Sequence, residues 1–314
     1  QVIDWAFSIA NKLYGLKFHI SKQEGYHQDV QVYNVTDFKG NWASHLLTDW
    51  HPRKGKRNGA WMTSYRKAYQ RNTTRVYPII SLVCNFSTSS DGKPALLTFN
   101  EVLTLFHEFG HGIHGMLGEG KYATLTGTSV AWDFVELPSQ FMENWCFEAT
   151  ELKQWARHYT SGEPMPDSII TNIKKSQKFL EGMATIRQLG LGLLDMAWHN
   201  PSNKEILDYK KLEESIFADL ELWSKEPGVT ISSAFSHIFS GGYSAGYYSY
   251  KWSEVLDADA FSRFSNEPDN SEVAQDFKKL LKAGGSIDPS VLFKNFMGRD
   301  PNINALLTRA GLDE

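Results

Sequence analysis

Residues 98–117 have the sequence TFNEVLTLFHEFGHGIHGML, and this stretch decides the fold. Its apolar residues recur near helical spacing, which predicts an amphipathic helix with Asn100 as the N-cap and Glu101 in the first turn, where an acid stabilises the positive end. His107 and His111 are four positions apart and therefore share one face of that helix. Two imidazoles placed in this way can bind one metal ion.

Glu108 adds a second kind of chemistry beside the histidines. It follows His107 and projects about 100° around the helix from it, so its carboxylate can reach a metal-bound water without taking a coordination position. Two neutral nitrogen ligands and one carboxylate base are what metal-assisted hydrolysis needs. The alternative is a pair of surface histidines on an ordinary amphipathic helix.

A hydrolytic zinc ion usually has a third protein ligand and keeps one position for water. Residues 132–147, WDFVELPSQFMENWCF, predict a second helix, whose regular part begins one turn late because of Pro138. Glu136 lies in this largely apolar run, where a metal ion would make the burial of its carboxylate favourable. Glu143 and Glu148 are rival ligands that fit the polar face better, and a solvated first-turn acid is the alternative for Glu136.

Two more residues lie close to this pattern. Asp133 either caps the second helix or accepts a hydrogen bond from the second ring nitrogen of a ligand histidine. His114 shares the face of His107, but an ideal helix places it about 10 Å along the axis, too far to share the ion. We therefore interpret His114 as a packing or substrate-side residue.

The composition limits the classes of partner. The chain has 314 residues, of which 41% are hydrophobic and 22% charged, with a net charge of −4 and no dense basic run. Nucleic acid and an anionic membrane surface are therefore not expected partners, and no apolar run is long enough to span a membrane. Cys84 and Cys146 lie in apolar surroundings, which predicts free buried thiols and a cytoplasmic location. The chain opens at Gln1 without a signal peptide, which indicates a fragment or ordered part of a longer protein.

The remaining pattern predicts a mainly α fold with a small antiparallel β-sheet (α+β). A β subdomain is expected at about 16–86 and a helical region with the metal site at about 98–314. The expected strands cover residues 16–20, 30–35, 42–50 and 78–86. The further expected helices cover residues 2–14, 151–160, 167–199, 204–224, 273–283, 289–297 and 302–310.

Two loops could serve a site. Residues 51–60, HPRKGKRNGA, form a basic loop that is a solvated turn by default and a contact for a substrate carboxylate in the alternative interpretation. Residues 118–131, GEGKYATLTGTSVA, connect the two motif helices. They are either a flexible linker or an exposed strand against which a peptide could lie.

Residues 237–252, HIFSGGYSAGYYSYKW, form a second chemically suggestive region. The glycine pair 241–242 precedes an expected helix on which Tyr243, Tyr247 and Tyr250 share one face. Phenols can stabilise a developing oxyanion, and the glycines would let Tyr243 move on and off a substrate. The alternative, which composition alone favours, is an aromatic core stripe whose hydroxyls are satisfied locally.

Three segments together carry a family resemblance. They are FHEFGHGIHG at 106–115, GTSVAWDFVELPSQFMENW at 127–145 and HIFSGGYSAGYYSYKW at 237–252. They resemble the thimet oligopeptidase family of zinc peptidases, which includes bacterial oligopeptidase A and the peptidyl-dipeptidases. The similarity runs from about Asn11 to the end of the chain. Family members are longer at the N-terminus, so residues 1–314 resemble their catalytic part, and the missing N-terminal half would complete a deep substrate channel.

The resemblance implies a metal site. One zinc ion per chain would be held by His107, His111 and Glu136, on a zincin-like helix within a multi-helix catalytic domain, with Glu108 as the base. The implied function is zinc-dependent hydrolysis of peptide bonds in short oligopeptides. One alternative is a peptidyl-dipeptidase that releases C-terminal dipeptides, because some segments lean towards those members. A distant alternative is a non-catalytic helical peptide-binding protein with a structural zinc, whose fourth ligand could be Cys146.

The resemblance also implies substrate contacts. His237, Tyr243 and Tyr250 would contact the substrate or its tetrahedral intermediate, with Tyr247 nearby, which favours the catalytic interpretation of the phenols over the core stripe. The loop residues Gly127 and Thr128 match the family pattern as well and are expected to bind substrate.

Overall fold

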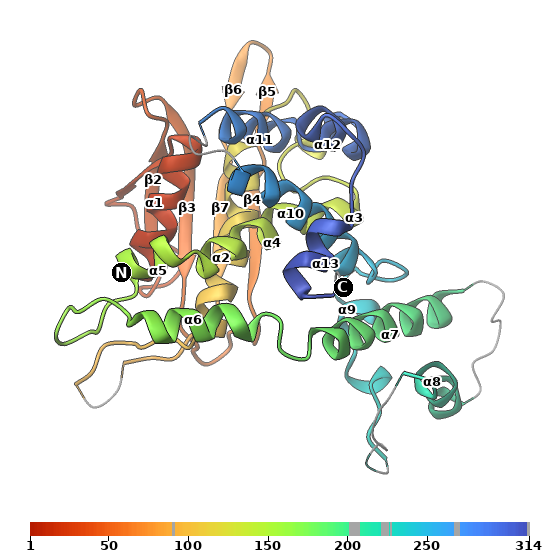
Figure 1. Ribbon diagram of the computed structural model, residues 1–314. Coiled ribbons are helices and arrows are strands. Elements are labelled where there is room, and N and C mark those ends of the chain that lie inside the picture. Colours follow the sequence, from red (N-terminus) through yellow and green to blue (C-terminus); the bar gives the residue numbers. More distant parts are fainter. Residues whose placement is uncertain (90–91, 201–207, 221–225, 227, 267–270, 313–314) are drawn as a thin grey trace.

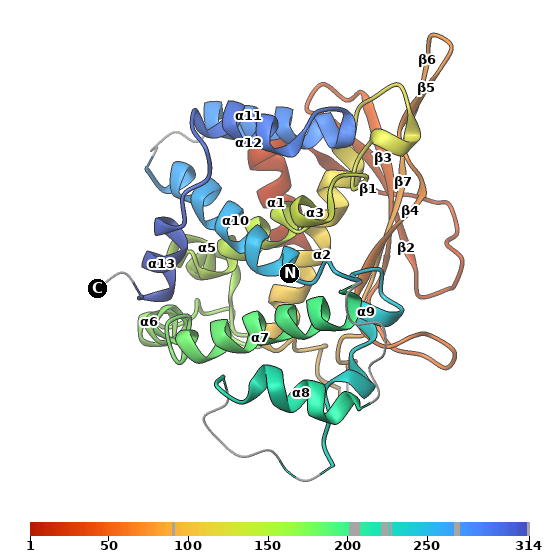
Figure 2. The ribbon, with the colours of Figure 1, turned by 90° about the vertical axis from the view of Figure 1, so that its right-hand side faces the viewer.

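The computed structural model describes residues 1–89, 92–200, 208–220, 226, 228–266 and 271–312. In these residues the chain begins with α1 (Val2–Tyr14), β1 (Lys17–Ile20), β2 (Gln31–Thr36), β3 (Trp42–Asp49), β4 (Trp61–Arg66), β5 (Tyr69–Arg71), β6 (Thr74–Val76) and β7 (Ile79–Val83). The helices that follow are α2 (Phe99–Leu117), α3 (Trp132–Val135), α4 (Leu137–Glu143), α5 (Ala149–Trp155), α6 (Asp167–Ser176), α7 (Glu181–His199), α8 (Tyr209–Phe217), α9 (Ser236–Phe239), α10 (Ser249–Asn266), α11 (Ser271–Ala283), α12 (Pro289–Met297) and α13 (Asn304–Ala310). Figure 2 shows the strands on one side of the molecule and the helices on the other, which confirms a mainly helical fold with one small sheet.

The larger sheet has the strand order β1-β2-β3-β7-β4 and is mixed, so the expectation of a purely antiparallel sheet is wrong. Its neighbours pair antiparallel except β3 and β7, which run parallel with Leu46 opposite Ile80. The cause is the route of the chain, which forms β4 at the edge and the β5–β6 hairpin before it inserts β7 between β3 and β4. Strand alternation could not reveal that order, and it missed β4 and the hairpin.

Helix α2 lies directly against the sheet because it carries glycines on that side. A Cβ at Gly112 would be 3.0 Å from the Cδ2 of Leu82, and one at Gly115 would be 2.7 Å from the Cδ1 of Ile80. Leu82 and Ile80 both lie on the interior strand β7 and are fully buried. The two glycines thus fix the motif helix on the sheet at a distance that larger side chains would not permit.

The start of α2 differs from the expected one by two residues. Thr98, rather than Asn100, is the N-cap: its hydroxyl accepts a hydrogen bond from the Glu101 backbone nitrogen at 3.2 Å, and the Glu101 carboxylate accepts from the Thr98 backbone nitrogen at 2.8 Å. This reciprocal capping box satisfies two backbone donors, which a cap at Asn100 could not do. Glu101 also accepts from the Ser87 backbone at 2.8 Å and so holds the preceding loop to the helix.

Two of the expected helices have different limits. The segment 167–199 is divided into α6 and α7, because Leu180 adopts a left-handed conformation with φ of 57°. The helix expected at 204–224 is seen as α8 over Tyr209–Phe217, and residues 204–207 and 221–224 lie outside the described residues.

A second, smaller apolar cluster lies apart from the main core. Its buried members are Leu191, Leu194, Phe217, Phe235 and Ile238. They come from α7, α8, α9 and the turn before α9, which occupy the lower right of Figure 1. We call these elements the α7–α8 lobe. This lobe lies beside the main body, in which α1, α2, α4, α10, α11 and α12 lie on one side of the sheet (Figure 2).

Helix α7 also carries apolar side chains that are exposed. The α7 stripe consists of apolar side chains on α7 and on the two residues before it, with exposed fractions of 38–75%, namely Phe179, Leu180, Met183, Ile186, Leu189, Leu193 and Met196. Its five members within α7 recur at helical spacing and lie on a different face from the buried Leu191 and Leu194. In the part of the chain that the structure describes, no helix is long and apolar enough to cross a lipid bilayer.

Candidate metal centre

The structure brings together the three residues that the sequence singled out as metal ligands. His107 and His111 of α2 and Glu136, at the junction of α3 and α4, offer ligand atoms that all lie within 4.8 Å of one another. The Oε2 atom of Glu136 is 3.2 Å from the Nε2 of His107 and 3.1 Å from the Nε2 of His111. A solvated first-turn acid is therefore excluded for Glu136, whose side chain is only 2% exposed.

A close approach of two helices puts Glu136 in this place. Gly110, between the histidines, faces α4 so closely that a Cβ would be 2.4 Å from the carbonyl oxygen of Pro138 and 2.6 Å from the Cα of Ser139. Pro138 lies in the first turn of α4, where its missing N–H leaves no donor unsatisfied. The Ser139 hydroxyl donates to Oε2 of Glu136 at 2.9 Å. The chain thus fixes the carboxylate by backbone contact and by a hydrogen bond.

The chemistry of this donor set fits a divalent metal ion. Burial alone would raise the pKa of the Glu136 carboxyl, but His111 and His107 hold that pKa well below its usual value. Two imidazole nitrogens and one carboxylate oxygen are the ligands of many catalytic zinc sites. Glu108 is 6% exposed, burial raises the pKa of its carboxyl, and its Oε2 has no hydrogen-bond partner among the described residues. An orphaned, buried carboxylate oxygen beside the group is what a metal-bound water would satisfy.

Glu143, and not Asp133, is the carboxylate that contacts a candidate ligand histidine. Its Oε1 lies 2.6 Å from the Nδ1 of His107, the position of a carboxylate that orients the ring, and it is not part of the group of His107, His111 and Glu136. Asp133 instead accepts a hydrogen bond from the Tyr248 hydroxyl at 2.9 Å, and α3 begins after Ala131, so both expectations for Asp133 are wrong. In the sequence, spacing could have indicated this role, because Glu143 follows Glu136 by two helical turns and would share its face of a helix.

His114 is a packing residue. It is fully buried, and neither ring nitrogen has a partner among the described residues. Burial, with a smaller effect of His111, lowers the pKa of His114 to about 3, so the imidazole stays neutral at physiological pH.

Tyr243 and Tyr247 approach the candidate metal group (His107, His111 and Glu136) from a loop, and only Tyr250 lies on a helix, as the second residue of α10. Helix α10 begins only at Ser249, and Ala245 has φ of 53°, which no regular helix allows. The expected helical face is therefore wrong, although the grouping of Tyr243 with Tyr250 is correct. Their rings stack at 5.0 Å, and the Tyr243 hydroxyl donates to the Oε1 of Glu136 at 2.5 Å.

His237 and Tyr247 border the same cluster. The His237 ring is 6.3 Å from the rings of both Tyr243 and Tyr250, and 6.0 Å from that of Tyr247. Tyr247 also packs on Phe235 at 4.8 Å, in the core of the α7–α8 lobe. Burial raises the pKa of the phenols of Tyr243 and Tyr250, so both remain protonated donors.

The loop 118–131 is neither an exposed strand nor a free linker. It contains a short 3₁₀ turn, Ala123–Leu125, and the Thr126 hydroxyl donates to the Ala68 carbonyl at 2.7 Å. Gly127, with φ of 57°, lies against the C-terminal end of α2, where a Cβ on Gly118 would be 2.6 Å from its nitrogen. The contacts of Gly127 are thus packing contacts. For Thr128 the structure shows a partly buried side chain.

The basic loop 51–60 uses two of its cations internally. Arg53 donates both guanidinium nitrogens to the Asp49 carboxylate at 2.6 and 2.8 Å, and Lys56 donates to the same carboxylate at 2.8 Å. Asp49 is 1% exposed, and Lys56 4%. Arg53 and Lys56 therefore hold the loop in place through ion pairs with Asp49, so this part of the loop is not a solvated turn.

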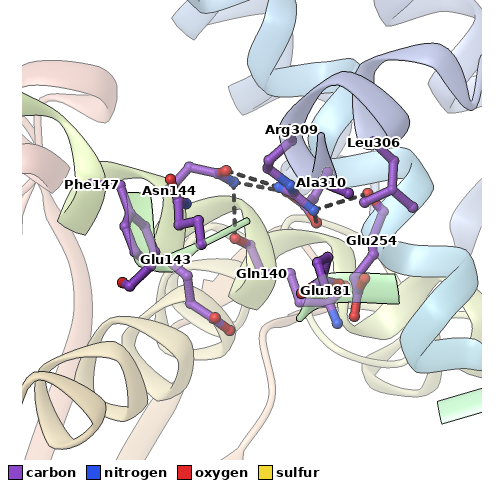
Figure 3. Close-up of a pocket in the computed structure, with 12 residues that line it drawn as sticks. Gln140, Glu143, Asn144, Phe147, Glu181, Glu254, Leu306, Arg309 and Ala310 are labelled. Atoms are coloured by element: carbon purple, nitrogen blue, oxygen red, sulfur yellow. Dashed lines mark hydrogen bonds and ion pairs between the residues drawn. The ribbon is translucent and has the colours of Figure 1, made fainter. Parts of the chain in front are cut away.

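A pocket of about 310 Å³ adjoins the metal group through Glu143 (Figure 3). Glu181 and Glu254 line the same pocket, and Arg309 on its wall is bound by Asp257 and Asn144. Lys251 pairs with Glu254 next to it. The pocket next to Glu143 is therefore lined by several carboxylates, and Arg309 and Lys251 neutralise two of them, Asp257 and Glu254.

The HExxH class of metal-site proteins has two histidines one helical turn apart and a glutamate beside the first of them, with a further carboxylate facing both rings. Here Glu136 faces both rings, and Oε2 of Glu108 has no hydrogen-bond partner in the part of the chain that the structure describes. The chain matches the model of Peptidase family M3 over residues 1–312, and it belongs to that family.

Two relatives illustrate the range of the family. The chain is 40% identical to oligopeptidase A of Haemophilus influenzae, over 99% of this chain and 47% of that protein. It is 37% identical to dipeptidyl carboxypeptidase of Salmonella typhimurium, over 98% of this chain and 46% of that protein. The chain thus spans about half the length of the curated relatives it matches. A crystal structure assigned to an oligoendopeptidase F of Bacillus anthracis shares the fold, with a TM-score of 0.50 and 16% identity over 84% of this chain and 39% of that one.

Proposed function

We propose that the protein is a metallopeptidase that hydrolyses peptide bonds in short oligopeptides with one zinc ion per chain. The observation that carries this proposal is the convergence of His107, His111 and Glu136 beside the orphaned carboxylate of Glu108. Membership of a peptidase family supports the same conclusion. Residues 1–314 would form the catalytic region, with the sheet at about 16–86 as a subdomain that supports the metal-site helix.

The residues of the chain would divide the work as follows. A zinc ion bound by the three ligands would act as a Lewis acid and lower the pKa of its water. Glu108, whose free Oε2 lies next to the ligands, takes a proton from the attacking water and returns it to the leaving amine. Glu143 accepts from the Nδ1 of His107 and so keeps the lone pair of Nε2 directed at the ion.

The phenol of Tyr243 would stabilise the oxyanion, with Tyr250 or His237 assisting. Tyr243 is protonated and reaches the group already, because its hydroxyl lies 2.5 Å from the Oε1 of Glu136. When a substrate carbonyl is present, the same donor would turn from the carboxylate to the carbonyl oxygen. Tyr247, Gly127 and Thr128 are further residues that we propose to bind substrate.

The variant Glu108→Gln tests the proposal. It keeps the side-chain shape and all three ligands but removes the base, so we expect bound zinc at wild-type level and loss of nearly all turnover. The measurements are metal content by mass spectrometry and cleavage of a quenched fluorescent peptide. Wild-type cleavage by this variant would refute the assignment, and a wild-type protein that binds zinc but cleaves no peptide would support the non-catalytic alternative.

A dipeptide-releasing peptidase is the second candidate, because the identities to oligopeptidase A and to dipeptidyl carboxypeptidase are similar, at 40% and 37%. Digestion of one peptide and of its C-terminally amidated twin separates the two activities. Release of a dipeptide from the free acid alone indicates the exopeptidase, whereas equal internal cleavage of both peptides indicates the oligopeptidase.

We also propose that further sequence of the kind carried by the longer relatives completes a substrate channel and covers the α7 stripe. The support is the exposure of that stripe, which includes Phe179 at 75% and Leu193 at 52%.

We further propose a cytoplasmic location. Cys84 and Cys146 are free and buried, which supports a reducing compartment such as the cytoplasm.

A further inference from the structure

Asp195 of α7 is a buried carboxylate whose partners lie in the tyrosine loop, by which we mean residues 240–248. It is fully buried, and its Oδ1 accepts a hydrogen bond from the Ala245 backbone nitrogen at 2.9 Å. Its Oδ2 accepts from the Tyr247 backbone nitrogen at 2.8 Å. The Nδ1 of His199, one turn further along α7, lies 2.7 Å from Oδ1. One side chain thus binds two alternate backbone amides of a segment that is 50 residues away.

The tyrosine loop needs such a support because its backbone is strained. Ala245 has φ of 53°, a left-handed conformation that is unfavourable for any residue with a Cβ. Two backbone hydrogen bonds shape the loop: the Tyr243 nitrogen donates to the carbonyl of His237 on α9 at 3.0 Å, and the Gly246 nitrogen donates to the Tyr243 carbonyl at 2.9 Å. Those bonds form the turn, whereas Asp195 fixes the turn to α7.

The position of the loop decides where the Tyr243 phenol lies. Tyr243 is two residues before Ala245, its hydroxyl meets Glu136, and its ring lies 4.8 Å from that of Trp132. Tyr247, the other residue bound by Asp195, packs its partly buried ring against the apolar cluster of the α7–α8 lobe. The loop therefore spans the distance from the lobe to the metal group, and Asp195 determines its anchorage at the lobe.

We propose that Asp195 is a positioning residue for the proposed peptidase reaction: through the amides of Ala245 and Tyr247 it holds Tyr243 where its phenol can donate to the oxyanion. This inference rests on the proposed function of the site. A carboxylate suits the task because both its oxygens accept hydrogen bonds. In Asp195→Asn one oxygen becomes an amide that faces a backbone N–H donor, so one of the two loop contacts is lost and replaced by a repulsive one.

Glu213 of α8 is a matched control. It is 2% exposed, lies in the same lobe and also accepts from two backbone nitrogens, those of Ile231 at 2.9 Å and Ser232 at 2.6 Å. Its partners precede the tyrosine loop and carry none of the proposed reacting groups. If Asp195 acted only by stabilising the lobe, Glu213→Gln would have the same kinetic effect.

The test is a double-mutant cycle on the zinc-loaded protein. We compare Asp195→Asn, Glu213→Gln and Tyr243→Phe, and each of the first two combined with Tyr243→Phe, on one quenched peptide. We expect Asp195→Asn to lower kcat by about tenfold or more, to change KM little and to add less than about twofold once the Tyr243 hydroxyl is absent. We expect Glu213→Gln to have a small effect that is equal in both backgrounds.

Hydrogen exchange of the backbone amides gives a readout that does not depend on activity. In Asp195→Asn the peptide that covers residues 241–250 should exchange at least about tenfold faster, and in Glu213→Gln the change should fall on residues 231–232 instead. If Asp195→Asn does not fold, Asp195→Glu, which keeps the charge but displaces it by one methylene, takes its place with the same expectations.

The outcomes separate this inference from the proposed function. Full additivity of Asp195→Asn with Tyr243→Phe, or unchanged exchange in the tyrosine loop, overturns the role of Asp195 while the peptidase assignment stands. A wild-type protein without peptidase activity overturns both. A loss of kcat that is coupled to Tyr243 and accompanied by faster loop exchange supports the inference.

Discussion

Because α4 lies so close to Gly110, adding a single methyl group at that position should disturb the candidate metal site. In Gly110→Ala the new Cβ would lie 2.4 Å from the carbonyl oxygen of Pro138 and 2.6 Å from the Cα of Ser139. Both neighbours are backbone atoms, so no side-chain rotation can relieve the overlap. Because non-bonded heavy atoms rest at about 3.5 Å or more, α4 has to move away from α2 by about 1 Å.

This displacement is large compared with what a metal site tolerates. Glu136 directly precedes α4 and moves with it, whereas zinc–ligand distances vary by only about 0.2 Å. Overpacking of this kind also destabilises a protein by about 1–3 kcal/mol. We therefore expect Gly110→Ala to fold with a lowered melting temperature and to bind zinc at least about tenfold more weakly.

The assay is zinc affinity by competition with a chelator of known Kd, together with thermal unfolding with and without zinc. Gly112→Ala is the control, since it adds the same methyl group to the same helix but meets side-chain atoms of Leu82 and no backbone, the nearest being Cδ2 at 3.0 Å. We expect that variant to bind zinc almost as the wild type does. Equal zinc affinity in Gly110→Ala and Gly112→Ala would refute the idea that helix spacing at Gly110 positions Glu136.

Three further predictions concern single side chains. Glu143→Gln should weaken zinc binding by about 10–100-fold in chelator competition, because the ligand imidazole loses its charged acceptor, and an unchanged affinity would contradict that role. Tyr243→Phe should lower kcat by about 10²–10³-fold with little change in KM, and steady-state kinetics that show the opposite split would assign the phenol to ground-state binding. Asp49→Asn should destabilise the fold by about 3–5 kcal/mol in urea at pH 7, because it leaves Arg53 and Lys56 without their buried acceptor. Burial alone would raise the pKa of the Asp49 carboxyl, but Arg53 and Lys56 outweigh that effect and hold the pKa well below its usual value. The stabilisation is thus present above about pH 4 and is lost as the pH falls below it, so a difference that persists unchanged at pH 3 would be inconsistent with this ion pairing.

The motif helix and the grouping of its two histidines with Glu136 could be predicted because each depends on features of a single segment. His107 and His111 share a helix face whatever surrounds them, and an acid such as Glu136 in an apolar run requires a partner. The cap could not be placed in the same way: Thr98 and Asn100 are both good capping residues, and only the reciprocal bond with Glu101 selects Thr98.

Other features depend on contacts between distant segments. The parallel pairing of β3 with β7 follows from the order in which the strands join the sheet, which alternation does not encode. The tyrosine loop satisfies a helical spacing of phenols by chance, and Ala245 in a left-handed conformation breaks the helix there. Asp195 looked like an ordinary residue of α7, since its amide partners are 50 and 52 positions away.

The α7 stripe has a practical consequence for anyone who prepares the 314-residue chain by itself. Seven apolar side chains, from Phe179 just before α7 to Met196 within it, are exposed to water. Such a surface drives concentration-dependent self-association, so light scattering of the purified chain should increase on concentration and decrease with a mild detergent. Replacing Ile186 and Leu193 with glutamine should reduce this self-association, because it removes two exposed apolar side chains. The fold of the lobe should be kept, because neither side chain contributes to its buried cluster.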